Sequence, residues 1–475
     1  MLKTNLYQPL FYLILFTPLL PFAQVSIPKK VNNEMSVELK AVQTPSNTFV
    51  AAIMTTKTGG FNDNISKVYR SADNGQTWDS VFAVLADSNF ARNPDPVLCM
   101  DNAGTIYLIL MRINKGTAKG QLWCYKSTDD GKTWSLAGKP YQGNSLPDYP
   151  QCIAKGNGEI YLTFLEYPSP IQFVKSMDGG KTWSTGIALN DNSQAGDPIG
   201  ADIGWTGNGN ICVAYGTYSQ TNLYISTSSD LGQSWSPATV VSGINKLSVN
   251  KIISSTKFAH LGVLSHRPHN SQTTVIYSKS EDAGKTWFTQ VLDSNASLAE
   301  GLIDNSGNIH VVYNKNVGNK FSLLYVFSSD KGKSFSKPSV LYTAPMNIGM
   351  AFGEYQSLIL ASDGLFHSTF IDFGDNFKAK QLVFSPMLSG INGPKTAFNA
   401  PLVYPNPANN TINISMDDLP PNTTYQVYDF NGLLIKQGNL TSSKSTIDAN
   451  ELKSNKYLLR INQGNRVFIN KIVVQ

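Results

Sequence analysis

The chain has 475 residues, of which 41% are hydrophobic and 11% aromatic, so it is long enough for several domains or one large repeat array. Its formal charge of +5 is small for this length and is not gathered into basic runs, which argues against a nucleic-acid partner. The four cysteines have no CxxC spacing and no cysteine–histidine cluster, so we expect no structural zinc and no cofactor.

The N-terminal residues have the pattern of a secretory signal peptide over residues 1–23. Lys3 lies in a short basic head, an apolar stretch follows, and the small residue Ala23 is the expected cleavage point. Pro18 and Pro21 interrupt the apolar stretch, which is already too short to be a comfortable membrane span. No later segment is a better candidate, so no transmembrane segment is expected in the mature chain.

One eight-residue pattern recurs six times: a serine, an aspartate two places later, a glycine, a hydroxyl residue and an aromatic residue. The copies begin at Ser71, Ser127, Ser176, Ser228, Ser280 and Ser328. Their aspartates are 56, 49, 52, 52 and 48 residues apart, a period typical of propellers and other arrays. Each copy lies between strand-like runs, so it is predicted to be a hairpin turn whose carboxylate accepts backbone N–H groups and whose glycine takes the positive φ. We interpret the motif, called the Asp turn below, as scaffold and not as catalyst.

A second repeated element is a short turn followed by an apolar strand. The copies begin at Gly104, Gly158, Gly209, Gly307 and Gly364, with a glycine-poor copy at Phe258. Together with the inner strands before them, they predict seven repeats of four strands, the first from near Met35 and the last, up to about Phe384, without an Asp turn. Residues 25–31 are expected to complete the last sheet and close the ring, which removes exposed sheet edges.

The six turns resemble the Asp-boxes, or BNR repeats, of the sialidase superfamily. The resemblance covers residues from about 35 to 390 and implies an all-β fold, an Asp-box β-propeller over residues 24–390 with seven blades favoured and six as the alternative. Asp-box propellers serve as glycosidases, binding modules and scaffolds, so the fold leaves the activity open.

The sequence changes character at Leu402, after a predicted linker at residues 391–401. Residues 402–475 alternate short strands with Asn and Gly turns, which predicts a small β-sandwich with its own core. The motifs YPNP, VYD and the closing KIVV resemble those of the C-terminal sorting domain of the type IX (Por) secretion system. The resemblance implies passage through the periplasm to the cell surface or the medium, with the type IX machinery as a partner.

The predicted inner strands begin with carboxylates on the face opposite the Asp turns, where ligands of such propellers usually bind. These acids include Asp95, Asp148, Asp197 and Glu300. In one interpretation, an acid held among like charges, Asp95 or Asp148, has a raised pKa and donates a proton in a glycosidase, while Asp197 and Glu300 contact the substrate. In the other interpretation, the acids cap the strands around a hydrated pore.

Two of the four cysteines, Cys99 and Cys152, lie four residues after Asp95 and Asp148, which the repeat interprets as the same position in adjacent repeats. The others are Cys124 on a predicted third strand and Cys212 on a predicted second strand. Core positions on different sheets favour free thiols over disulfides.

The resemblance to sialidases implies three arginines on the substrate carboxylate and a tyrosine nucleophile. Arg92, Arg112 and Arg267 fall on the predicted ligand face and suit bidentate binding of a carboxylate. However, Arg92 and Arg112 share one repeat, whereas the arginines of sialidases come from three blades. Tyr355 heads a late inner strand, where the family places its nucleophile, so it is the candidate nucleophile; the alternative is an aromatic lining residue.

Aromatic residues after the predicted second strands form a further candidate site. Tyr167 and Tyr218 suit stacking on sugar rings. The leading hypothesis is an exported sialidase-like propeller that acts on or binds extracellular glycans or glycoconjugates, with hydrolysis of the exo-sialidase type left open. The alternative is a non-catalytic surface scaffold or adhesin that recognises a protein or a polysaccharide.

Overall fold

The computed structural model describes residues 25–475 with gaps, and the description below is confined to those residues. The gaps are 58–62, 191–197, 207–208, 218–222, 242–247, 256–259, 268–273, 318–319, 346–355, 386–400, 417–418, 420, 422, 430–432 and 464–465.

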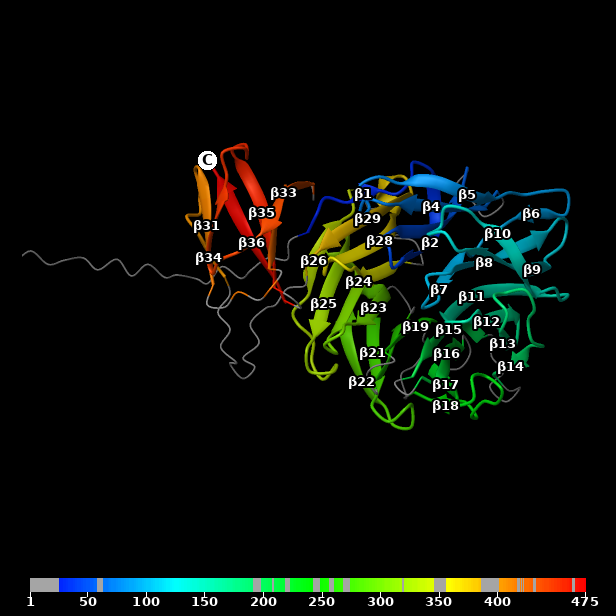
Figure 1. Cartoon of the computed structure of the whole chain (residues 1–475). Helices are drawn as coiled ribbons and strands as arrows, with labels where there is room; N and C mark the ends of the chain where they lie inside the picture. Colours follow the sequence, from blue (N-terminus) through cyan, green and yellow to red (C-terminus); the bar gives the residue numbers. More distant parts are fainter. Residues whose placement is uncertain are drawn as a thin grey trace, which may run out of the picture.

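The described strands between residues 29 and 384 form seven antiparallel sheets that follow one another along the chain (Figure 1). The first three are β2 (Met35–Gln43), β3 (Phe49–Thr56), β4 (Ile65–Ser71) and β5 (Asp79–Val84); β6 (Phe90–Arg92) with β7 (Val97–Met100), β8 (Ile106–Asn114), β9 (Gly120–Ser127) and β10 (Ser135–Tyr141); and β11 (Leu146–Lys155), β12 (Glu159–Tyr167), β13 (Ile171–Ser176) and β14 (Ile187–Ala188). The next three are β15 (Pro198–Trp205), β16 (Ile211–Thr217), β17 (Leu223–Ser228) and β18 (Thr239–Val240); β19 (Ser248–Ser254), β20 (Leu261–Arg267), β21 (Thr274–Ser280) and β22 (Phe288–Ser294); and β23 (Ala296–Ile303), β24 (Ile309–Val317), β25 (Lys320–Ser328) and β26 (Ser339–Thr343).

The seventh sheet joins the two ends of this region. It consists of β27 (Ser357–Leu360), β28 (Phe366–Asp372) and β29 (Lys378–Phe384), with β1 (Lys29–Lys30) as its outermost strand. The pairing of Lys29 with Gln381 confirms that the N-terminal segment completes this sheet. A single turn of 3-10 helix, η2 (Phe373–Asp375), connects β28 to β29.

The inner strands contact one another in a cycle. Strand β2 contacts β7, and the contacts continue through β11, β15, β19, β23 and β27, which in turn contacts β2. The hydrophobic cores lie between neighbouring sheets: one core, for example, combines Ile109 of β8 with Leu162 of β12. Strand β8 is buried along almost its whole length, because neighbouring sheets cover both of its faces. Its sequence is accordingly an almost continuous apolar run.

Each Asp turn closes on its own serine and aspartate. The Ser176 hydroxyl donates to Asp178 Oδ1 at 2.9 Å and accepts the Gly180 N–H at 2.9 Å. The Asp178 carboxylate accepts the N–H of Thr182 at 2.9 Å and its hydroxyl at 2.6 Å. The glycine of each turn takes the predicted positive φ, and the residue before it does so too (Asn74, Asp130, Gly179, Leu231, Ala283 and Lys331).

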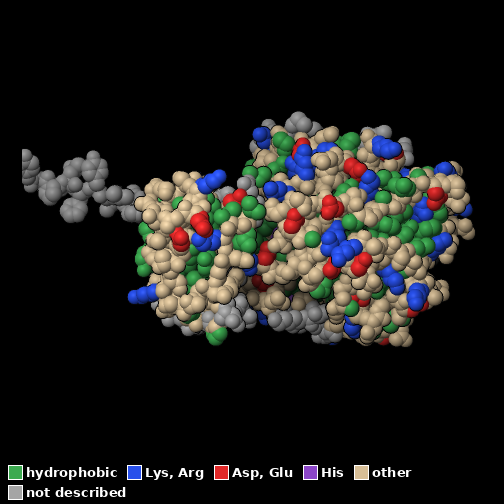
Figure 2. All heavy atoms as spheres, turned by 45° about the horizontal axis from the view of Figure 1, so that its top comes forward, with side chains coloured by type: hydrophobic (Ala, Val, Ile, Leu, Met, Phe, Trp, Pro, Cys, Tyr) green, Lys and Arg blue, Asp and Glu red, His purple; other side chains and the backbone are tan. Residues whose placement is uncertain are grey.

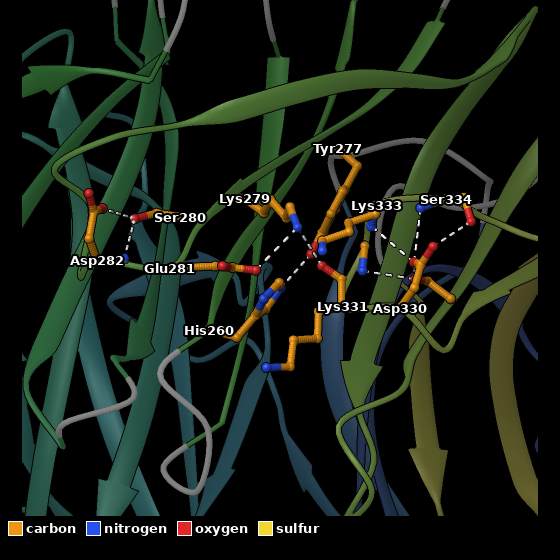
Figure 3. A network of polar contacts seen from close by, with 12 residues as sticks. His260, Tyr277, Lys279, Ser280, Glu281, Asp282, Asp330, Lys331, Lys333 and Ser334 are labelled. Carbon is orange, nitrogen blue, oxygen red and sulfur yellow. Dashed lines mark hydrogen bonds and ion pairs between the residues drawn. The ribbon is translucent and has the colours of Figure 1, made fainter. Parts of the chain in front are cut away.

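A basic residue just before the serine connects one Asp turn to the next. Lys279 Nζ donates to the carbonyl oxygen of Lys331 in the following turn, at 2.8 Å (Figure 3). The same link joins Arg70 to Asp130 and Lys175 to Leu231, each at 2.9 Å. The turns joined in this way therefore lie on the same side of their sheets.

The C-terminal region forms two further sheets around a separate core (Figure 1). Strands β30 (Leu402–Tyr404), β31 (Thr411–Ser415) and β34 (Lys444–Asp448) make one sheet, and β33 (Leu434–Asn439), β32 (Thr424–Asp429), β35 (Asn455–Gln463) and β36 (Arg466–Val474) make the other. Ile412 and Ile447 of the first sheet pack with Leu459 and Ile472 of the second.

The surface carries basic and acidic side chains that are interspersed on the face shown in Figure 2. Among the residues that the structure describes, no helix has the length and apolar character needed to cross a membrane.

Candidate functional site

The inner strands of five sheets each contain a β-bulge near their start. The register shifts lie between Ser36 and Glu38 in β2, Asp148 and Gln151 in β11, Ile199 and Ala201 in β15, Ser248 and Asn250 in β19, and Ser297 and Glu300 in β23. Tyr149 and Leu298 take positive φ values of 50° and 51° at two of these bulges, and Asp95, just before β7, has a φ of 54°. Bulges redirect side chains, and here they accompany the charged residues of the inner strands.

Three carboxylates from neighbouring inner strands meet at Asp95. The Asp95 N–H donates to Glu38 Oε2 at 3.2 Å, and the Asp95 carboxyl hydrogen-bonds with the side chains of Glu38 and Asp148. Burial raises the pKa of Asp95, and the negative charges of Glu38 and Asp148 raise it further. Asp95 therefore retains its proton where an ordinary aspartate has lost it.

Two lysines from other sheets converge on Glu300. Glu300 Oε2 lies 3.5 Å from Lys40 Nζ and 4.0 Å from Lys251 Nζ. Burial disfavours the charge on Lys40, but attraction to Glu300 and Asp202 outweighs it and raises the pKa of Lys40. Burial and the nearby Lys40 lower the pKa of Lys251. Glu300 thus lies between two amino groups that come from two other inner strands.

Asp202 completes this group from a fourth inner strand. Its Oδ2 accepts the N–H of Ile252, next to Lys251, at 2.7 Å. Burial raises the pKa of Asp202, while the positive charge of Lys251 acts against that shift. Four inner strands, β2, β15, β19 and β23, therefore contribute charges to one network.

Lys40 connects the two groups of charges. It contacts Glu300 and also lines a cavity of about 10 Å³ together with Asp95, Pro96 and Gln151. A cavity of this size holds about one water molecule. The carboxyl groups of Asp95 and Glu300 thus lie in different environments beside one lysine. Two nearby acids in different environments are a starting point for acid–base catalysis.

Arg112, one of the three arginines predicted on the ligand face, makes its own contacts within the second sheet. Its side chain is buried: Nε donates to Asn93 Oδ1 and one terminal N–H to Asp87 Oδ2, both at 2.7 Å. The guanidinium also lies over the rings of Phe90 and Trp123, 4.3 and 4.4 Å from their centroids. These contacts give Arg112 a structural role in the second sheet, and its role in substrate binding stays a prediction.

The other predicted site residues divide into three groups. Asp95 and Asp148 meet in the acid cluster, and Glu300 lies in the lysine cluster. Arg92 is half-buried at the end of β6, and Tyr167 is 57% exposed at the end of β12. Arg267 ends β20, but its side chain is not among those described, and Asp197, Tyr218 and Tyr355 lie outside the described residues.

The sequence analysis missed four residues of these charged groups: Asp202 and Lys251, and also Glu38 and Lys40. Glu38 and Lys40 are two positions apart in β2, so their side chains share one face, while Leu39 and Ala41 pack in the core on the other face. Two charges alternating with apolar residues in a predicted inner strand would have been the signal. Within the described chain, no group of three or more His, Cys, Asp or Glu residues is arranged to hold a metal ion.

Two family models match the chain and confirm both resemblances. Residues 165–368 match the BNR repeat-like domain, and residues 402–475 match the secretion system C-terminal sorting domain. The chain combines a BNR repeat domain with a type IX sorting domain. The sorting domain indicates export by the type IX system to the cell surface or the medium.

Several solved structures are similar to the BNR domain at low identity. A protein of unknown function from Dyadobacter fermentans is 14% identical with a TM-score of 0.49, over 76% of this chain and 98% of its own. An α-L-arabinanase from Penicillium chrysogenum is 14% identical with a TM-score of 0.44, over 76% and 96%. The intramolecular trans-sialidase from Ruminococcus gnavus is 14% identical with a TM-score of 0.44, over 78% and 99%. Similarities of this degree do not bear on the activity of this chain. No curated protein matches it.

Proposed function

We propose that residues 24–390 form a closed propeller of seven blades and that the C-terminal region is a β-sandwich which serves as an export signal. The cycle of contacts from β2 to β27 and back to β2 supports the ring. The pairing of β1 with β29 supports closure of the last blade by the N-terminal segment. The shared core of the two C-terminal sheets supports the sandwich.

Within this ring, we propose a glycoside hydrolase that acts on extracellular glycans, with Asp95 as the proton donor. The observation that carries the proposal is the pair of different environments around Lys40: burial and the carboxylates of Glu38 and Asp148 raise the pKa of Asp95, whereas Glu300 lies 3.5 Å and 4.0 Å from the amino groups of Lys40 and Lys251. A glycosidase needs this division, because one carboxyl group protonates the leaving oxygen and the other stabilises or attacks the anomeric carbon.

Asp148 acts in this scheme through Asp95. The two carboxyl groups that flank a glycosidic bond are about 5 Å apart or more, whereas Asp95 and Asp148 are in hydrogen-bond contact. We therefore assign Asp148, with Glu38, to positioning and holding the proton of Asp95. The second carboxylate is Glu300, and Tyr355 remains the candidate nucleophile if the substrate is a sialoside.

A neutral glycan fits the cluster better than a sialoside does. The acids around Asp95 repel a substrate carboxylate, and Arg112, one of the three arginines proposed to bind one, is occupied by Asp87. Tyr167 is exposed and able to stack on a sugar ring. Arg92, Arg267, Asp197 and Tyr218 remain candidate contacts at the rim of the site.

One observation favours a second candidate function, a non-catalytic surface scaffold or adhesin. The cavity beside Asp95 is about 10 Å³, far smaller than a sugar ring, so the charges of the inner strands serve equally well as a plug that fills the ring. Under this proposal, the charged groups stabilise the propeller, and recognition of a protein or polysaccharide takes place on its outer surface.

Hydrolysis of aryl glycosides, neutral sugars and sialosides in parallel, tests the first proposal. Asp95→Asn keeps the shape but removes the donated proton, so turnover should fall about 100-fold or more. Asp79→Asn, an exposed aspartate at the start of β5, is the matched control and should retain full turnover. A wild-type protein without turnover, or an active Asp95→Asn variant, would reject the hydrolase and leave the scaffold.

A further inference from the structure

Three of the four cysteines share one hydrophobic core. Cys99 of β7, Cys124 of β9 and Cys152 of β11 pack in the core between the second and third sheets, whereas Cys212 lies in a different core. All four are free thiols in the structure. Three thiols in a single core raise the question of whether two of them face each other.

The register of their strands turns Cys99 and Cys152 toward each other, although both are free thiols in the structure, as their places on different sheets predict. Cys99 lies opposite Tyr107 in its sheet, but Ile153, not Cys152, lies opposite the equivalent Tyr161. The two cysteines are therefore one residue out of register. Because a shift of one residue turns a side chain to the other face of a strand, Cys99 points toward the third sheet and Cys152 back toward the second.

The surroundings of the two thiols agree with this geometry. Strands β7 and β11 are in contact and both cysteines pack in one core, where burial raises the pKa of the Cys99 thiol and the neighbouring Cys152 raises it further. Ile153, the next residue of β11, packs in the core on the opposite side, between the third and fourth sheets. Burial and the nearby Cys152 raise the pKa of the Cys124 thiol. The Cys124 thiol donates to the Tyr125 carbonyl oxygen.

We propose that Cys99 and Cys152 form a disulfide in the exported protein and that this bond links the second sheet to the third. The sorting domain sends the chain out of the cytoplasm, where thiols are kept reduced, into compartments where disulfides form and persist. The bond closes a loop of 54 residues, both cysteines included, that contains the whole Asp turn from Ser127 to Trp134.

The chemistry requires an external disulfide as the oxidant. Cys152 is partly exposed and Cys99 is buried, so the Cys152 thiolate attacks the disulfide of a periplasmic thiol oxidoreductase and releases one of its sulfurs. The Cys99 sulfur then attacks the mixed disulfide. One S–S bond forms in the chain, two thiol protons and two electrons are lost, and the oxidant becomes a dithiol. Burial raises the pKa of Cys99, which makes this second step the slower one.

The bond also affects the candidate site, because each cysteine lies four residues after an acid of the cluster. Cys99 follows Asp95, and Cys152 follows Asp148. A covalent link between β7 and β11 fixes the two strands from which the Asp95–Asp148 contact is made. The bond itself does not depend on whether the cluster is catalytic.

Peptide mass mapping of the protein recovered from the medium or the cell surface tests the proposal. The protein is denatured and alkylated without reductant and then digested with trypsin. We expect peptides 93–112 and 133–155 as one cross-linked species, two hydrogens lighter than their sum, with alkylated Cys124 and Cys212. Four alkylated cysteines, or a cross-link that contains Cys124 or Cys212, would overturn it.

A second measurement keeps the test independent of how well the variants fold. Reductant should lower the thermal midpoint of the wild-type protein by several degrees and should have no effect on Cys99→Ser. Cys212→Ser, which removes a buried thiol from another core, is the control and should keep the sensitivity to reductant. A wild-type midpoint that is indifferent to reductant contradicts a stabilising bond. Neither measurement uses glycan turnover, so this proposal and the hydrolase fail separately.

Discussion

Replacement of Ser176 by alanine should destabilise the propeller, and the hydrogen bonds of the Ser176 hydroxyl within its Asp turn determine by how much. The Ser176 side chain is buried, and the substitution removes only its hydroxyl oxygen, so no cavity larger than that atom is made. The oxygen accepts the N–H of Gly180 and donates to Asp178, both at 2.9 Å. The turn therefore loses one acceptor and one donor without any change in its apolar packing.

The two losses are unequal in free energy. The Gly180 N–H is buried, so water cannot replace the lost acceptor, and an orphaned buried donor costs about 1–3 kcal/mol. Asp178 is exposed and keeps its hydrogen bonds to Thr182, so the loss of the hydrogen bond from Ser176 costs only about 0.5–1 kcal/mol. The free energy of unfolding should fall by about 1.5–4 kcal/mol, most of it from Gly180.

Denaturant unfolding followed by tryptophan fluorescence measures this effect on the propeller alone. All seven tryptophans lie at or before Trp287, so the C-terminal sheets are silent. Ser135→Ala, at an exposed position of β10, is the matched control and should change the free energy by less than about 0.5 kcal/mol. If Ser176→Ala and Ser135→Ala unfold at the same midpoint with the same slope, the turn does not depend on the serine, and the account of the repeat is wrong.

Three further outcomes are expected. Hydrogen bonds from Thr182 lower the pKa of Asp178 to about 2 in the folded protein, below its unfolded value. The stability that the Asp178 carboxylate gives the folded state is therefore complete above about pH 4 and is lost as the pH falls toward 2. Asp178→Asn should flatten that part of the fluorescence–pH curve. Asp95 has the opposite sign, since its raised pKa means that the folded state holds a proton which the unfolded state has lost. Stability should therefore fall as pH rises through the folded pKa, and Asp95→Asn should remove that slope in unfolding curves measured from pH 4 to 8. Lys40→Met should lower the free energy of unfolding by about 1–3 kcal/mol, and by less in a Glu300→Gln background. Equal losses in both backgrounds of this double-mutant cycle would show that Lys40 and Glu300 do not interact.

The repeated turn could be predicted because its chemistry is local. The serine, aspartate, glycine and threonine that bond one another lie within seven residues, and so does the φ requirement that selects glycine. Spacing between copies then predicts the order of the sheets. The C-terminal sorting domain could be predicted equally well, because its motifs and its separate core, from Ile412 to Ile472, belong to one short stretch of sequence.

The candidate site was only partly readable because its contacts are not local. Lys40 contacts Glu300, which lies 260 positions away in the sequence, and the residues around either one do not predict this contact. The bulges add a second difficulty, since one extra residue reverses the face of each later side chain, as it does for Cys152. The ion pair of Arg112 was missed for a related reason: its partner Asp87 lies in a loop whose path could not be derived from the sequence.

In the proposed ring, closure and the charged cluster depend on each other. Lys40 belongs to the first sheet and Glu300 to the sixth, with the seventh between them in the cycle of inner strands. A ring left open at the seventh sheet would separate the two residues and remove the partner of each charge, which costs several kcal/mol where the charge stays buried. The ion pair would therefore favour the closed ring over an open one. Closure in turn brings Glu300 to Lys40, which already lies beside Asp95 of the neighbouring second sheet, and so completes the charged groups on which the proposed chemistry depends.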